Sequence, residues 1–318
     1  MLEKVKAKDN ELGQMIDDYI KQKRYPQINS VLLYQNGQII VERYYNKFTK
    51  ESRNPIKSIW KSIISIGIGI CLDKGSIESL DEPICRYLEA FNQNNHPYHK
   101  LITIKHLLTM TSGIYWNGGK HYHCPMLEQL RRTQDWLAHL ADIQMEEVPG
   151  RKHVYKEWDV ILLSAIISQV TGMNTFDFCN SYLFTPLDIK SEKWWTSPCG
   201  ITYNIGNKPL DEATSHLCAR DLAKIGNLFL NSGKYNGKQI ISESYVKEAT
   251  TPTEQNSNYG FLWWLGDGWY GCRGFGGQEI RVMPEQNRVG IIQATPTSLG
   301  KSYEDVFVLC NQASLILE

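Results

Sequence analysis

A serine and a lysine on the same side of one turn, Ser58 and Lys61, are the residues of this chain best suited to covalent chemistry. If Ser58 opens a helix, the ammonium nitrogen of Lys61 can reach back to the serine hydroxyl. A lysine acts as a base only when it is neutral, and burial lowers the pKa of a lysine toward that state. The apolar stretch 62–72 supplies the burial. The pattern therefore indicates a serine hydrolase that forms an acyl-enzyme.

The motif is short, and the alternative is a capping serine with a solvated lysine. The segment behind it is also ambiguous, because 66–70 alternates isoleucine with glycine as a strand does, and β-branched residues disfavour helices. Its length, its apolar character on all sides and its end at Asp73-Lys74-Gly75 favour a buried helix with a glycine C-cap. We therefore expect a central helix that begins at Ser58.

Charge and hydropathy exclude several classes of protein. The chain has 34 basic and 34 acidic residues, whereas proteins that bind nucleic acid or anionic membrane surfaces usually carry a basic patch. The longest apolar stretch is too short to span a bilayer. Residues 1–24 are rich in charge and resemble an amphipathic helix rather than a secretion signal. We expect a cytoplasmic protein whose partner is a small molecule.

The cysteines and histidines indicate no metal site. The 8 cysteines lack short paired spacings, so neither a zinc site nor a disulfide framework is predicted, and reduced, mostly buried thiols are expected. The one cluster with ligand-type residues is His121-Tyr122-His123-Cys124, which follows a glycine-led loop and has no fourth ligand at a recognisable spacing. We expect no metal and no organic cofactor.

The order of elements predicts the fold class. Asn36-Gly37 predicts a hairpin between strands 30–34 and 39–45. The chain from 80 to about 229 is mainly helical, with its clearest helices at 103–110 and 158–170. Short strand-like runs return at 259–265, 270–274, 279–283 and 289–294, and a closing helix is expected at 303–317.

A sheet split in this way predicts an α/β (α+β) fold, in which an antiparallel sheet is flanked by helices and interrupted by an inserted all-helical lobe. We expect one domain over 1–318, with a sheet lobe from 1–75 and 230–318 and a helical lobe from 76–229. A cleft between the lobes is the natural place for an active site.

With these landmarks, the chain resembles the serine β-lactamase and penicillin-binding-protein superfamily. The likeness is to the class C β-lactamase-related branch, which includes esterases and 6-aminohexanoate-oligomer hydrolases. Besides Ser58-x-x-Lys61, the segments that carry the resemblance follow the family's order along the chain at 102–113, 148–155, 219–226 and 275–278.

The resemblance implies roles for individual residues. Ser58 is the acylated nucleophile, Lys61 is its lysine partner, and Tyr155 is the tyrosine of the family's Tyr-x-Asn motif, which relays a proton to the leaving group. The backbone N–H groups of Ser58 and Phe275 form the oxyanion hole. Without the resemblance, Tyr155 would be interpreted as a packing aromatic.

Two motifs depart from the family. Cys272-Arg273-Gly274 stands where the family usually has Lys or His, then Thr or Ser, then Gly. Gly274 still lets a substrate approach the strand edge, but Cys272 supplies no cation, and Arg273 contacts a substrate only if it faces the cleft rather than solvent.

Glu157 replaces the asparagine of Tyr-x-Asn, and an ionised carboxylate cannot donate a hydrogen bond to a substrate amide. It can pair with Lys61 or with an ammonium group of a substrate. Asp159 either shares that role or is simply a surface acid.

These residues predict a serine hydrolase acting on a small ester or amide. One alternative keeps β-lactam or D-amino-acid peptide chemistry, as in a β-lactamase or a penicillin-binding protein. Another is a non-catalytic binding protein on the same fold. Seven tryptophans, at 116, 158, 194, 195, 263, 264 and 269, are candidates for an aromatic cleft wall, but tryptophan is more often a core residue.

Overall fold

The computed structural model describes residues 3–4, 9–93, 96–119, 124–204, 215–297 and 300–316. These residues divide into two compact units. Unit 1 comprises Met1–Ile59, His216–Asn231 and Gly266–Glu318, and unit 2 comprises Trp60–Ser215 and Ser232–Leu265.

The bounds of the units differ from those of the two expected lobes. Helix α2 (Ile59–Asp73), expected with the sheet, belongs almost entirely to unit 2, and so does 232–265. Helix α8 (Ala219–Leu230), expected in the helical lobe, belongs to unit 1.

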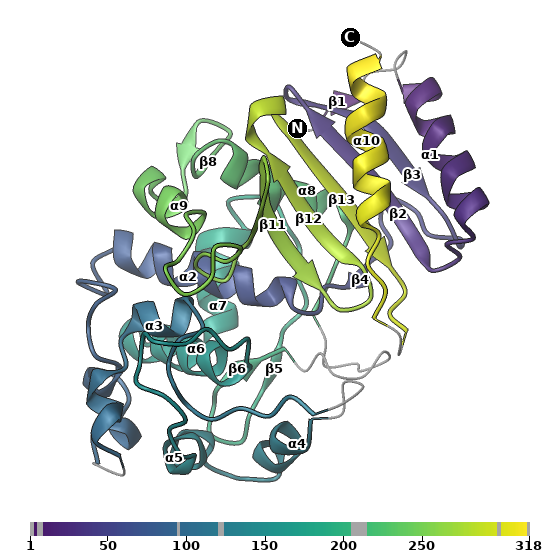
Figure 1. Cartoon of the computed structure of the whole chain (residues 1–318). Coiled ribbons are helices and arrows are strands. Elements are labelled where there is room, and N and C mark those ends of the chain that lie inside the picture. The colour runs from purple at the N-terminus through teal and green to yellow at the C-terminus, as the bar shows by residue number, and fades with distance from the viewer. Residues whose placement is uncertain are drawn as a thin grey trace. The chain divides into compact units, whose positions relative to one another are not determined.

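Within the described residues, the strands form a seven-stranded sheet in the order β1-β3-β2-β13-β12-β11-β10 (Figure 1). The first six of these strands belong to unit 1, as does Gly266 of β10. β1 is parallel to β3, and the pairs from β3 through β11 are antiparallel. The early hairpin and the late strands therefore meet where β2 pairs with β13, as the split sheet predicted. The strands are β1 Glu3–Lys4, β2 Ile28–Gln35, β3 Gln38–Tyr44, β10 Trp264–Gly266, β11 Trp269–Gly274, β12 Gln278–Met283 and β13 Arg288–Ala294.

Two predicted sheet features have different outcomes. The hairpin turn is confirmed, since Asn36 and Gly37 both have positive φ (49° and 85°), as a tight two-residue turn requires. The strand predicted at 259–265 is confirmed only at its end, where Trp264 and Leu265 begin β10, and it is wrong at 260–263, where the chain bends. The Gly260 N–H donates to the carbonyl of Trp263, and Leu262 has φ 62°, which reverses the chain before β10.

Helices cover both faces of the sheet. A side chain at Gly226 of α8 would touch Val289 and Ile280, whereas a side chain at Gly290, next to Val289 in β13, would touch Phe307 of α10 (Glu304–Ile316). Because neighbouring strand residues point to opposite faces, α8 and α10 lie on opposite sides. Helix α1 (Asp9–Lys23) packs beside α10.

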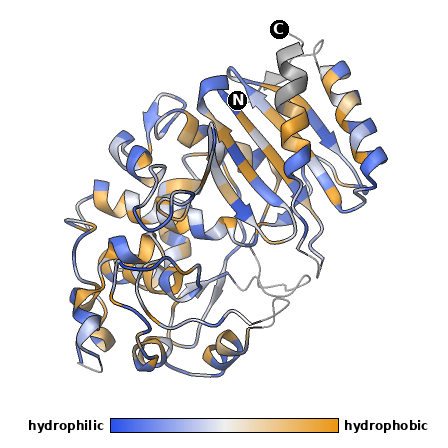
Figure 2. Ribbon diagram, in the orientation of Figure 1, coloured by the Kyte–Doolittle hydropathy of each residue, from blue (hydrophilic) through white to orange (hydrophobic). Residues whose placement is uncertain are grey.

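The apolar core of unit 1 lies between the sheet and these two terminal helices. Figure 2 shows apolar residues on the strands and on α10. The core residues are Leu12, Ile16, Ile20, Ile28, Val31, Leu33, Val41, Ile292, Ala294, Tyr303, Val306, Phe307 and Cys310.

Unit 2 is mainly helical, and α2 is its buried centre. The prediction of a helix here is confirmed, and the glycines that resemble a strand pattern have a packing role. A Cβ at Gly67 would lie 2.9 Å from Ile167 of α6 (Trp158–Thr171), and one at Gly69 would crowd Tyr245 of α9 (Glu243–Ala249). The isoleucine–glycine alternation therefore lets neighbouring helices approach α2 closely.

Short elements complete the two units. Unit 2 contains α3 Ile104–Leu108, α4 Pro125–Arg131, α5 Trp136–Asp142, α7 Thr175–Cys179 and the hairpins β5 Trp195–Thr196 with β6 Thr202–Tyr203 and β8 Lys234–Tyr235 with β9 Lys238–Gln239. It also contains 3₁₀ turns at Ile84–Arg86, Glu89–Phe91 and Pro97–Leu101 and a π-helical turn at Asn180–Phe184. Unit 1 contains β4 Asn54–Pro55, which pairs with β7 His216–Leu217, and a 3₁₀ turn at Pro284–Gln286.

In the part of the chain that the structure describes, no single helix is long and apolar enough to cross a membrane. The helices Trp158–Thr171 and Thr175–Phe184, bent by 77° at their junction, pass that test only together. The predicted thiols Cys71, Cys124, Cys179 and Cys310 are buried. Of the cluster considered for metal binding, residues 121–123 lie outside the described residues, and the described residues contain no group of three metal-ligating side chains.

Candidate active site

Ser58 stands at a constrained turn in unit 1, immediately before α2. Lys57, the preceding residue, is buried and has φ 52°, in the left-handed region that residues with a side chain rarely adopt. Such backbone conformations cost free energy and cluster at functional sites. The constraint therefore falls next to the residue predicted as the nucleophile.

The end of β11 packs against the same turn. A Cβ at Gly274 would lie 2.4 Å from the Ile56 carbonyl oxygen and 3.1 Å from the Lys57 Cβ, so only glycine fits. This close approach explains why Gly274 is kept in Cys272-Arg273-Gly274, although the first two residues of this motif differ from the family. It also brings together the two segments that end in Ser58 and Phe275, the predicted donors of the oxyanion hole.

Lys61, in the first turn of α2, lies in a buried polar cluster of unit 2. Its Nζ donates hydrogen bonds to both carboxylate oxygens of Glu157, each at 2.7 Å. The Tyr203 hydroxyl donates to Glu157 Oε2, also at 2.7 Å. The side chains of Lys61 and Glu157 are only 5% and 16% exposed. Of the partners considered for Glu157, the structure therefore selects Lys61.

This ion pair corrects the expected charge of Lys61. Burial alone would lower the pKa of Lys61, but the Glu157 carboxylate and Tyr155 outweigh it, and the pKa lies above its usual value. The lysine is therefore a cation rather than the neutral base expected from its apolar surroundings. Burial and Glu157 raise the pKa of Tyr203 well above its usual value, so Tyr203 remains a neutral donor.

Tyr155 lies in the same cluster, between the lysine and an aromatic wall. Lys61 Nζ is 5.2 Å from the centre of its ring. The ring of Trp264 is stacked on it at 5.7 Å, with 28° between the planes, and Tyr259 meets it edge-on at 6.3 Å. The structure thus brings together Lys61, Tyr155 and Glu157 and adds two residues that were not predicted for the site, Trp264 and Tyr203. Trp264 was one of seven undistinguished tryptophans, and no sequence signal marked Tyr203.

Arg273 and Cys272, which differ from the family, are respectively paired with acidic residues and buried. Arg273 pairs with Glu279 (3.3 Å) and Glu304 (2.8 Å), and its guanidinium lies over the ring of Trp269. This supports a structural role rather than the substrate-binding role considered for Arg273. Cys272 has no exposed surface, so its side chain is a poor candidate for substrate contact.

Asp159 is also not where it was expected. It is completely buried rather than a surface acid, and it accepts a hydrogen bond from Ser112 at 2.6 Å rather than pairing with Lys61.

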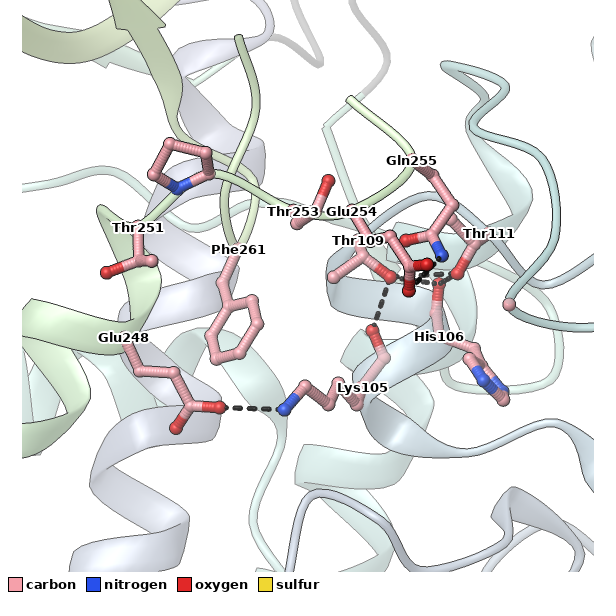
Figure 3. A pocket seen from close by; sticks show the side chains of 12 residues that line it. Lys105, His106, Thr109, Thr111, Glu248, Thr251, Thr253, Glu254, Gln255 and Phe261 are labelled. Atoms are coloured by element: carbon pink, nitrogen blue, oxygen red, sulfur yellow. Dashed lines mark hydrogen bonds and ion pairs between the residues drawn. The ribbon is translucent and has the colours of Figure 1, made fainter. Parts of the chain in front are cut away.

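A separate pocket of about 510 Å³ lies elsewhere in unit 2 (Figure 3). Lys105 and Glu248 form an ion pair of 2.9 Å beside Phe261, and the hydroxyls of Thr109 and Thr111 bond each other. Its lining includes none of the residues of the Lys61 cluster.

The buried ion pair predicts a pH-dependent stability. In the Glu157→Gln variant, Lys61 loses its counter-charge, and burial then lowers its pKa below the unfolded value of about 10.4. The variant should be less stable than the wild type by about 3–5 kcal/mol at pH 7. This deficit should shrink toward pH 9, because Lys61 loses its proton at a lower pH in the folded variant than in the unfolded chain. In the wild type the folded pKa is raised, so the contribution of Lys61 is complete below about pH 10 and is lost only above it.

Urea denaturation at the two pH values measures this difference. Glu146→Gln is the matched control, because Glu146 pairs with Lys152 at the surface, where a pair contributes at most about 1 kcal/mol. Equal, small losses in both variants would contradict the raised pKa of Lys61.

Comparison with known proteins identifies the family and the fold. Residues 12–305 match the Beta-lactamase family, and the chain belongs to that family. An uncharacterised protein of Alkalihalophilus pseudofirmus is 24% identical over 303 residues, which cover 82% of each chain. The 6-aminohexanoate-dimer hydrolase of Paenarthrobacter ureafaciens is 20% identical over 69% of this chain and 56% of its own length.

Among solved structures, EstCE1, described as a hydrolase with promiscuous acyltransferase activity, superposes with a TM-score of 0.72 at 15% identity. The superposition covers 95% of this chain and 97% of EstCE1. The fold is therefore the β-lactamase/transpeptidase-like α+β fold predicted from the sequence.

Proposed function

We propose that this protein is a serine hydrolase that forms an acyl-enzyme on Ser58 and hydrolyses a small ester or amide. The observation that carries the proposal is the buried cluster of Lys61, Tyr155 and Glu157, which starts one helical turn after Ser58 in a chain of the Beta-lactamase family. Two similar proteins are named as hydrolases, one of them for an amide-linked dimer.

The charge state of Lys61 decides the proton path that we propose. A protonated lysine cannot accept the proton of Ser58, so Tyr155 takes it as the serine oxygen attacks the substrate carbonyl. Glu157 accepts two hydrogen bonds from the Lys61 ammonium, and a hydrogen bond with Tyr155 also contributes to the raised pKa of the lysine. The same cation can therefore stabilise the tyrosine as a phenolate.

The same tyrosine then returns the proton to the leaving alcohol or amine as the carbonyl–leaving-group bond breaks. Water attacks the acyl-enzyme in a second step of the same kind, which releases the acid and regenerates Ser58. The backbone N–H groups of Ser58 and Phe275 stabilise the oxyanion, and removing one such donor typically costs about 3 kcal/mol.

The departures from the family motifs favour a substrate without a carboxylate. Glu157, ionised and bonded to Lys61, offers no donor to a substrate amide and repels anions. Arg273 is held by Glu279 and Glu304, and Cys272 is uncharged and buried. Neither supplies the free cation that would attract the carboxylate of a penicillin or cephalosporin.

Short-chain aryl esters are therefore expected to be hydrolysed at least about 100-fold faster, in kcat/KM, than a chromogenic cephalosporin, a difference of roughly 2.7 kcal/mol in transition-state stabilisation. Steady-state assays of both substrates on the same preparation measure the ratio. Equal or faster hydrolysis of the cephalosporin would favour β-lactam chemistry instead. No turnover of either substrate, together with reversible binding, would favour a non-catalytic binding protein.

A further inference from the structure

The segment 150–159, which carries Tyr155 and Glu157, is fastened along its length to the segment 109–115. Both segments belong to unit 2. Its main-chain and ring hydrogen bonds are Gly150 N to Thr111 O (2.8 Å), Val154 N to Met110 O (2.9 Å), His153 Nδ1 with Thr109 O (3.0 Å) and Trp158 Nε1 to Tyr115 O (3.1 Å).

A second buried charged group, which the proposed chemistry does not use, connects the same two segments. Lys156 Nζ donates to Ser112 Oγ (3.2 Å) and to the carbonyl of Ile114 (2.8 Å), and Ser112 Oγ donates to Asp159 Oδ1 (2.6 Å). Lys156 is 1% exposed, and Ser112 and Asp159 have no exposed surface. One serine hydroxyl thus bridges a buried cation and a buried anion.

Lys156 stands between the two site residues in the sequence, and its side chain takes the opposite direction. Tyr155 and Glu157 both contact Lys61, whereas Lys156 reaches down to Ser112 and Ile114. Because the three residues are consecutive in the chain, holding the Lys156 side chain on one side restricts the directions open to its two neighbours. The buried bridge therefore sets the direction in which Tyr155 and Glu157 point.

We propose that Ser112, Lys156 and Asp159 are positioning residues that hold Tyr155 and Glu157 against Lys61, an inference that rests on the proposed hydrolase function. Burying two charges costs free energy, because both must leave water. Lys156 belongs to the same segment as Tyr155 and Glu157, the two residues that contact Lys61. A misplacement of about 1 Å in a catalytic side chain can slow a reaction by roughly 100-fold.

The ionisation of Asp159 makes the bridge pH-sensitive. Burial raises the pKa of Asp159 to about 6, against the opposing effects of Lys156 and Ser112, which face it. His153 lies close enough to Lys156 for the lysine charge to lower the pKa of His153, with burial as the larger cause. In a loosened segment Asp159 would be solvated and would have its ordinary pKa of about 3.9, so the closed segment binds the proton more tightly. As the pH falls through about 6, proton uptake by Asp159 therefore favours the closed segment, and this contribution is lost as the pH rises.

The test compares Ser112→Ala and Asp159→Asn with Ser30→Ala in the full-length protein. Ser30 is a matched control, because it is equally buried and its hydroxyl donates one hydrogen bond, to Gln293, within the sheet of unit 1. Two readouts are used: the rate of covalent labelling by a fluorophosphonate between pH 5 and 8, and amide hydrogen exchange of residues 153–158.

We expect Ser112→Ala to slow labelling by about tenfold or more at pH 7.5 and Ser30→Ala to change it less than twofold, even where the two variants lose similar stability. In the wild type, exchange at 153–158 corrected for the intrinsic rate should be no faster at pH 5 than at pH 8, and Asp159→Asn, which has no proton to gain at this position, should lack any such pH dependence. Exchange at 153–158 should be faster in Ser112→Ala, which loses the bridging hydroxyl, but not in Ser30→Ala.

Unchanged exchange at 153–158 in Ser112→Ala would overturn the inference, and so would a labelling rate of this variant equal to that of Ser30→Ala at every pH. The exchange experiment does not depend on catalysis. A wild type that is not labelled, combined with faster exchange in Ser112→Ala, would therefore refute the proposed hydrolase function while supporting the role of the bridge in holding this segment.

Discussion

Replacing Ser58 by alanine is expected to abolish ester hydrolysis while leaving the melting temperature nearly unchanged. The hydroxyl is the proposed attacking atom, so its loss removes the covalent step rather than weakening it. Only one oxygen atom is lost, at a residue in front of α2 rather than within the core.

Ser62→Ala is the informative control, because it also removes a serine hydroxyl close to Lys61. The Ser62 hydroxyl is buried and donates to the Leu262 carbonyl at 2.6 Å, so this variant should lose about 1 kcal/mol of stability and keep its turnover. Steady-state kinetics and thermal denaturation of the three proteins give the answer. Turnover by Ser58→Ala above a few per cent of wild type would rule out Ser58 as the nucleophile.

The second large effect is expected from Lys61→Met, which removes the ammonium and keeps most of the side-chain volume. Without the cation, Tyr155 loses its electrostatic support as a base, and acylation of Ser58 should fall by about 10²- to 10⁴-fold. The same change leaves the buried Glu157 carboxylate without its counter-charge, with only the hydrogen bond from Tyr203, which should cost about 3–5 kcal/mol of stability.

The double variant Lys61→Met with Glu157→Gln separates these two losses. It removes both charges of the pair, so most of the stability should return while the acylation rate stays low. Lys105→Met is the control for losing a lysine from an exposed ion pair and should have little effect on either quantity. If the double variant regained acylation to within tenfold of wild type, Lys61 would be a structural cation only.

Much of the fold is predictable because its signals are local. Asn36-Gly37 defines a turn through two neighbouring backbone conformations, and the apolar run after Ser58 is long enough to exclude a single strand. The strand predicted at 259–265 is interrupted at 260–263, because local propensity is outweighed there by the backbone conformation of the folded chain. Its apolar and aromatic residues have high strand propensity, but a hydrogen bond from Gly260 to Trp263 and the left-handed Leu262 reverse the chain.

The site is less predictable, because its chemistry depends on residues that are distant in sequence. The burial of Lys61 follows from its apolar neighbours, and that expectation is confirmed. The direction of the pKa shift of Lys61 does not follow from those neighbours, because this direction is set by Glu157, 96 residues further along the chain. Tyr203 and Trp264 likewise reach the cluster only through the tertiary fold, and no periodicity or motif indicates their position.

Intact-protein and peptide mass spectrometry of the wild type after incubation with a fluorophosphonate determines whether Ser58 is the nucleophile. The reagent bonds to a serine oxygen that is activated as a nucleophile. We expect a single adduct on the peptide that contains Ser58, absent from Ser58→Ala and formed much more slowly in Lys61→Met. An adduct on another residue, or no adduct on the folded wild type, would contradict the assignment of Ser58 as the nucleophile.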